Sequence, residues 1–113
     1  MILLVDDDKS VLNVYTQLLE HSGYKVSSHL CPKQALTAFS VQPQAFKAII
    51  TDYTMKQMTG LNLIASAENI NPHIKSILYT GMPPKQAPEH ITVLQKPARM
   101  TQVLSLLRQL QAF

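Results

Sequence analysis

Cysteine is almost absent from the sequence, and long apolar runs are missing altogether. The single cysteine, Cys31, excludes an internal disulfide and a zinc cluster built on cysteines. No apolar stretch approaches membrane-spanning length, and Met1–Val5 is far too short for the apolar region of a signal peptide. We therefore expect a cytoplasmic domain that makes no contact with a membrane.

Acidic residues are also scarce, and most of them lie in two places. The chain has seven Asp and Glu against ten Lys and Arg, and four of the seven are Asp6, Asp7, Asp8 and Asp52. The basic residues are scattered and never form a run, so no nucleic-acid-binding patch is indicated. The four histidines have no ligand spacing among them, which argues against a histidine-based metal enzyme.

The order of short apolar and amphipathic segments indicates one α/β domain that spans residues 1–113. Five segments have the composition of strands: 1–5, 24–28, 48–51, 74–79 and 91–94. Four others have the apolar spacing of helices: 11–19, 32–39, 61–67 and 100–110. This alternation predicts a parallel sheet with helices on both faces. Between the last two strands, Pro83, Pro84 and Pro88 leave residues 82–90 too broken for a regular helix.

Charged and hydroxyl side chains follow the carboxyl ends of four predicted strands. They are Asp6 to Asp8, Asp52, Thr80 and Lys96. An acidic loop in which one Asp caps the next helix and the others are solvated is the simpler interpretation. However, open α/β sheets bind their ligands at the carboxyl ends of the strands. The gathering of these groups at one edge therefore favours a site for a cation and for phosphoryl chemistry.

With these motifs in order, the sequence resembles the receiver domains of response regulators, the phosphoacceptor modules of two-component signalling. The likeness covers essentially the whole chain and rests on Val5-Asp6-Asp7, Asp52-Tyr53-Thr54-Met55 with Gly60, Thr80-Gly81 and Lys96-Pro97. It implies a flavodoxin-like, doubly wound, five-stranded parallel sheet in the order 2-1-3-4-5. It also implies a signalling domain, and not an enzyme, that assists only its own phosphorylation and dephosphorylation.

The resemblance assigns roles in phosphoryl transfer to four residues. Asp52 would accept the phosphoryl group from a phosphohistidine of a histidine kinase or histidine phosphotransfer protein. Lys96 would place a compact positive charge on the phosphoryl oxygens, and Thr80 would donate its hydroxyl to them. Pro97 would follow a cis peptide bond that aims the lysine into the site.

The resemblance also implies a magnesium site, since a carboxylate that attacks an anionic phosphoryl group needs charge neutralisation. Mg²⁺ prefers oxygen ligands and keeps several waters. By resemblance, Asp7 and Asp52 bind it directly, the backbone carbonyl of Thr54 supplies a third ligand, and Asp6 acts through water. Asp8 lies one position beyond the motif, and we assign it to capping the following helix.

Three departures from the family pattern bear on signalling. Lys56 replaces the proline usual four residues after the acceptor, and Val93 replaces the aromatic switch residue three positions before the lysine. The segment from Thr80 to Lys96 is shorter than usual where the fourth helix should lie, so we expect this helix to be shortened or missing. These departures favour a receiver that passes phosphate along a relay or gates a kinase, as in hybrid histidine kinases.

Two alternatives stay open. A pseudo-receiver would keep the fold and bind partners without phosphorylation. Val93, in place of the aromatic switch residue, is the feature that supports this alternative. A haloacid-dehalogenase-like phosphatase would use Asp6 as nucleophile and Asp8 as acid/base. Against this phosphatase, the chain is short and Asp52 would have no task.

Overall fold

A parallel sheet of five strands runs through the computed structural model, which describes residues 1–82, 84–96 and 98–110. The strands are β1 (Ile2–Val5), β2 (Val26–His29), β3 (Ala48–Asp52), β4 (Lys75–Thr80) and β5 (Thr92–Gln95). Their order is β2-β1-β3-β4-β5, and all neighbouring pairs are parallel, which confirms the expected doubly wound order. Because the order reverses between β1 and β3, the carboxyl ends of these two strands border the crevice where such sheets bind ligands.

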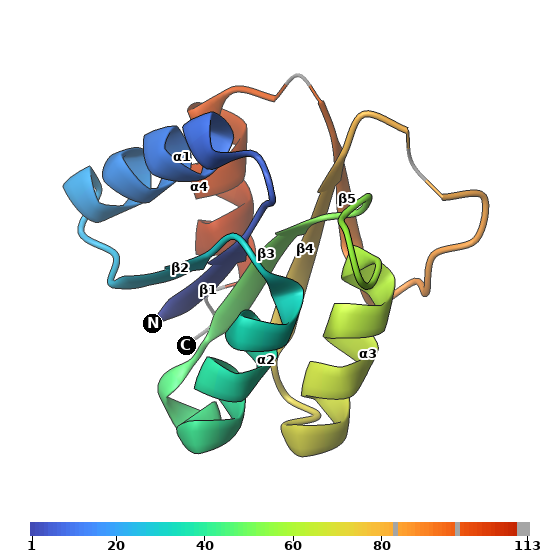
Figure 1. Cartoon of the computed structure of the whole chain (residues 1–113). Coiled ribbons are helices and arrows are strands. Elements are labelled where there is room, and N and C mark those ends of the chain that lie inside the picture. The colour runs from blue at the N-terminus through green and yellow to red at the C-terminus, as the bar shows by residue number, and fades with distance from the viewer. Residues whose placement is uncertain (83, 97, 111–113) are drawn as a thin grey trace.

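Helices cover both faces of this sheet (Figure 1). α1 (Lys9–His21) and α4 (Met100–Leu110) lie on one face, and α2 (Pro32–Val41) and α3 (Gly60–Ile70) lie on the other. A short 3-10 helix, η1 (Pro43–Ala45), leads into β3. Strand β1 is buried on both faces: Leu3 and Val5 pack toward α2 and α3, and Ile2 and Leu4 pack toward α1 and α4. None of the helices in the described ranges is long and apolar enough to cross a membrane.

Strands β2, β4 and β5 begin one or two residues later than the apolar pattern predicts, and each extends one residue further at its carboxyl end. In each of these three strands, the first predicted residue donates its backbone N–H to the end of helix α1 or to a preceding turn. Tyr24 donates to the carbonyl of Leu19 at 3.1 Å, and Ile74 and Ile91 donate to turn carbonyls at 3.2 and 3.1 Å. A donor that is committed to a turn is not available to the hydrogen-bond ladder of the sheet.

The connection from β4 to β5 differs from the other three. Each of the first three strands is joined to the next through a helix, whereas the described part of this connection, residues 81–82 and 84–91, contains none. Figure 1 shows it as a long loop that leaves the edge of the sheet. The expected shortening or loss of the fourth helix is therefore confirmed. On the edge strand β5, Val93 is 36% exposed.

Candidate functional site

Three carboxylates from two adjacent strands meet at the carboxyl edge of the sheet. β1 is followed directly by Asp6 and Asp7, and β3 ends at Asp52. The register pairs Val5 with Thr51, so Asp6 and Asp52 leave neighbouring strands at the same level. One carboxylate oxygen from each of the three Asp residues lies within 4.8 Å of the other two. Oxygen donors at this spacing suit a hard divalent cation such as Mg²⁺.

Asp8 belongs to helix α1 and not to this cluster. Its Oδ1 accepts the backbone N–H groups of Ser10 at 2.9 Å and Val11 at 3.2 Å, which confirms the expected helix cap. Asp6 in turn accepts the backbone N–H of Asp8 at 2.9 Å. Because Asp8 is committed to the cap, it is poorly placed as the acid/base partner of Asp6 in a phosphatase.

The carboxyl group of Asp6 lies in an unfavourable environment for a negative charge. The residue is 4% exposed, and burial raises the pKa of its carboxyl above the ordinary value of 3.8. The backbone N–H of Asp8 and the Lys96 ammonium oppose this rise in pKa, whereas the carboxylate of Asp52 adds to it. Bringing these carboxylates together therefore has a free-energy cost that a bound cation would remove.

Lys96 brings positive charge to the cluster from the end of β5. Its Nζ lies 3.3 Å from Oδ1 of Asp52 and 3.9 Å from Oδ2 of Asp6. The backbone N–H of Lys96 donates to the carbonyl of Thr80 at 2.8 Å, which ties this residue to the end of β4. The structure thus brings together the predicted lysine and the predicted carboxylates. The cis peptide bond expected before Pro97 lies outside the described residues.

The other two predicted residues, Thr80 and Thr54, lie at the end of β4 and in the loop after β3. Thr80 is 2% exposed, but its hydroxyl donates to the carbonyl of Met82 at 3.0 Å and accepts the N–H of Met82 at 3.1 Å. Its contact with a phosphoryl group therefore stays a prediction. Thr54 is exposed in the loop after β3, and the ligand role of its carbonyl also stays a prediction. In the same loop the backbone N–H of Lys56 donates to Oδ2 of Asp7 at 3.4 Å.

Two tyrosines next to the cluster were not predicted to take part in the site. The Nζ of Lys96 lies 4.8 Å from the centroid of the Tyr79 ring, and the hydroxyl of Tyr15 on α1 donates to that of Tyr79. In the sequence, Tyr79 belongs to an apolar strand and Tyr15 to the apolar side of a helix, which both patterns assign to the core. The position of Tyr79 directly before Thr80 was the one signal that could have placed it near the site.

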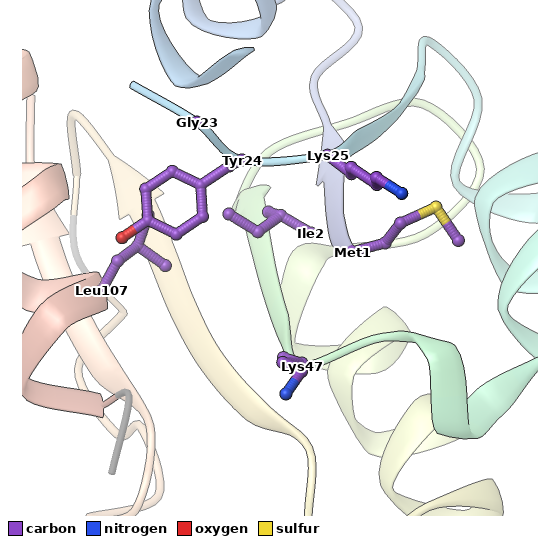
Figure 2. A pocket seen from close by; sticks show the side chains of 7 residues that line it. All are labelled: Met1, Ile2, Gly23, Tyr24, Lys25, Lys47 and Leu107. Atoms are coloured by element: carbon purple, nitrogen blue, oxygen red, sulfur yellow. The ribbon is translucent and has the colours of Figure 1, made fainter. Parts of the chain in front are cut away.

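A separate cavity of about 280 Å³ opens at the opposite, amino edge of the sheet. Figure 2 shows the side chains that line it: Met1, Ile2, Tyr24, Lys25, Lys47 and Leu107, together with Gly23. None of the predicted site residues lines this cavity. Asp6, Asp7, Asp52 and Lys96 lie instead at the carboxyl edge.

A doubly wound sheet with paired acids and a lysine at the carboxyl ends of its strands defines a receiver. The chain matches the family model described as response regulator receiver domain over residues 2–108, and it belongs to that family. These domains are the phosphoacceptors of two-component signalling, and histidine kinases or phosphotransfer proteins are their general kind of partner.

Relatives in sequence include both short and long proteins. Over 111 residues the chain is 29% identical to the response regulator receiver protein CpdR of Brucella abortus, an overlap that covers 92% of this chain and 90% of CpdR. Over 62 residues it is 40% identical to the putative two-component response regulator ARR21 of Arabidopsis thaliana, which covers 55% of this chain. The chain spans 10% of the length of that plant regulator.

Solved receiver structures have the same fold. The receiver domain of the hybrid histidine kinase CckA gives a TM-score of 0.86 at 23% identity, with 96% of both chains covered. The chemotaxis protein CheY4 of Vibrio cholerae gives 0.85 at 22% identity, also with 96% of both chains covered. These two likenesses concern the fold alone.

Proposed function

We propose that this domain takes a phosphoryl group onto Asp52 from the phosphohistidine of a histidine kinase or a histidine phosphotransfer protein. The observation that carries this proposal is the convergence of Asp6, Asp7, Asp52 and Lys96 at one edge of the sheet. A carboxylate oxygen of Asp52 attacks the phosphorus, and a P–O bond forms while the P–N bond breaks. The released imidazole keeps the electron pair and takes up a proton.

The charges of the site suit this transfer. Lys96, with its Nζ 3.3 Å from Asp52, stabilises the negative charge on the transferred phosphoryl oxygens. The three carboxylates fit Mg²⁺. Asp7, Asp52 and the carbonyl of Thr54 would bind the ion directly, and Asp6 would act through water. When bound, the ion neutralises charge between the carboxylates and the incoming phosphoryl group. The hydroxyl of Thr80 is released from Met82 and donates to the phosphoryl group once it is present.

The position of the domain in a signalling chain is part of the proposal. With no helix among the described residues of the β4–β5 connection, and with Val93 in place of an aromatic, the surface beside β5 lacks the usual switch. We therefore assign the domain to a relay or to the control of a hybrid kinase, as a signalling module that catalyses no reaction of another substrate. A cytoplasmic location stays a prediction. Tight dimerisation of the phosphorylated domain through residues 82–94, measured by sedimentation, would contradict this assignment.

The phosphoacceptor role is tested by incubating the protein with acetyl phosphate and Mg²⁺ and measuring its mass. We expect the gain of one phosphoryl group, which disappears in Asp52→Asn and on chelation of Mg²⁺. Asp8→Asn is the matched control, because asparagine also caps helices and Asp8 stands outside the cluster. Labelling of another residue would refute the role of Asp52. A folded protein that gains no phosphoryl group and binds no beryllofluoride would be a pseudo-receiver.

A further inference from the structure

The two carboxylates beside Lys96 define the position of its ammonium group only loosely. Nζ lies 3.3 Å from one carboxylate and 3.9 Å from the other, and the lysine side chain is 29% exposed. An ion pair in such a partly hydrated place contributes little order, because holding a lysine side chain in one conformation costs entropy. A further contact is needed to hold this ammonium group beside Asp52.

The ring of Tyr79 makes this contact. The Lys96 Nζ lies over it at 4.8 Å from the ring centroid, within the range of a cation–π interaction. Tyr79 is 7% exposed, so water screens the interaction little. Its Cα is also the register partner of Asp52, so the ring and the proposed acceptor leave adjacent strands at the same level.

Helix α1 holds the same ring from another direction. The hydroxyl of Tyr15 donates to the hydroxyl of Tyr79, and the two ring centroids are 5.2 Å apart. Burial, with the Tyr79 hydrogen bond as the next cause, raises the pKa of Tyr15, so this hydroxyl keeps its proton at physiological pH. The two tyrosines, Asp6 and Asp52 line one cavity of about 10 Å³, no more than the space of a single water molecule. The group is therefore closely packed.

We propose that Tyr79 is a positioning residue for phosphoryl transfer: its ring, which packs against the ring of Tyr15, keeps the Lys96 ammonium beside the Asp52 carboxylate. This inference rests on the proposed role of Asp52. An aromatic ring suits the task because it attracts a cation without carrying a formal charge. The ring therefore adds no negative charge that would oppose the incoming phosphoryl group.

The test compares the rates at which variants are phosphorylated by acetyl phosphate at saturating Mg²⁺. Tyr79→Leu removes the ring but keeps a buried apolar side chain, and we expect a fall of about three- to tenfold. Tyr79→Phe keeps the ring and should retain most of the rate. Phe39→Leu is the matched control, because Phe39 is buried, its ring centroid lies 5.4 Å from that of Phe46, and it packs on the face of the sheet covered by α2 and α3. We expect it to have the wild-type rate.

Two further readouts separate positioning from a general effect on structure. In a Lys96→Met background, adding Tyr79→Leu should change neither the residual rate nor beryllofluoride affinity, since Tyr79 acts through the lysine. In NMR spectra of the unphosphorylated protein, the ring should shift the Lys96 side-chain protons upfield. Tyr79→Leu should abolish this shift, whereas Tyr79→Phe should keep it.

The inference is overturned if Tyr79→Leu keeps the wild-type rate, or if Tyr79→Phe loses as much rate as Tyr79→Leu. It is equally overturned if Phe39→Leu loses as much, or if Tyr79→Leu has its full effect without Lys96. Should wild type gain no phosphoryl group on Asp52, the proposed function fails. The NMR comparison then still decides whether the ring of Tyr79 holds Lys96.

Discussion

Both edges of the sheet bring like charges together, in different surroundings, and at the carboxyl edge Lys96 accompanies the carboxylates. At the carboxyl edge, Asp6 is buried and shares its space with two other carboxylates. At the amino edge, Lys25 and Lys47 are exposed and line one cavity with Met1 (Figure 2), and their charges act on the amino group of Met1. Buried like charges stay strongly coupled, whereas exposed ones are weakened by water and salt. Burial, more than charge itself, therefore distinguishes a cation site from an ordinary surface.

The two edges can also be compared through a glycine at each, Gly60 and Gly23. Substitution of Gly60 should cause the largest loss of stability. A Cβ added at Gly60 would lie 2.2 Å from the backbone oxygen of Asp52 and 2.7 Å from the side chain of Leu78. Because the oxygen cannot move without moving the acceptor residue, we expect Gly60→Ala to lower the free energy of unfolding by about 3 kcal/mol. Phosphorylation should slow as well. Urea denaturation and the acetyl phosphate assay measure the two effects.

Gly23, at the amino edge, is the control for this substitution. A Cβ there would have no neighbour within 4 Å, but its φ of +96° is strained for any other residue. Gly23→Ala should therefore cost about 1 kcal/mol of unfolding free energy and leave phosphorylation unchanged. A loss of phosphorylation equal to that of Gly60→Ala would mean that the two edges are not independent.

The same comparison explains which parts of the site could be predicted from sequence. Asp6, Asp52 and Lys96 directly follow or end apolar strands, and the rule that parallel strands share one carboxyl edge is enough to bring them together. The partnership of Tyr15 and Tyr79 joins residues 64 positions apart, which no local pattern records. The engagement of the Thr80 hydroxyl by Met82 likewise depends on a loop conformation that the residue types do not define. Local patterns thus predicted the carboxyl edge, and packing decides the rest.

Asp6→Asn tests the cost of burying the Asp6 charge beside two other carboxylates, and its effect on stability should be intermediate. Without Mg²⁺ at neutral pH, we expect this variant to gain about 1 kcal/mol of unfolding free energy, because one of three clustered carboxylates is removed. With Mg²⁺ the gain should shrink or reverse, since wild type then binds the ion more tightly. Chemical denaturation with and without the ion measures both states. A gain that is the same in the two conditions would contradict a cation site.

The pH dependence of the same variant has a defined sign. Burial raises the pKa of Asp6 in the folded domain, so between 3.8 and that higher value the folded state binds more protons than the unfolded state. The free energy of unfolding of wild type therefore falls as pH rises through this window. Asparagine does not titrate. The excess in unfolding free energy of Asp6→Asn over wild type should therefore grow as pH rises through this window, and it should vanish at lower pH. Parallel stability curves for the two proteins would contradict the burial argument.

Lys25→Gln makes the corresponding change at the amino edge, and there the effect should be smallest. Burial, then Lys47 and Lys25, lower the pKa of the Met1 amino group from 8.0. Between that lowered pKa and 8.0, this group therefore adds to the free energy of unfolding as pH rises. Removing Lys25 should reduce this gain by about 0.3 kcal/mol, because these charges are largely hydrated, and salt should remove the difference. Denaturation midpoints at low and high ionic strength measure it. An effect as large as that of Asp6→Asn, and insensitive to salt, would make the amino edge a buried charge cluster, and burial would no longer distinguish the two edges.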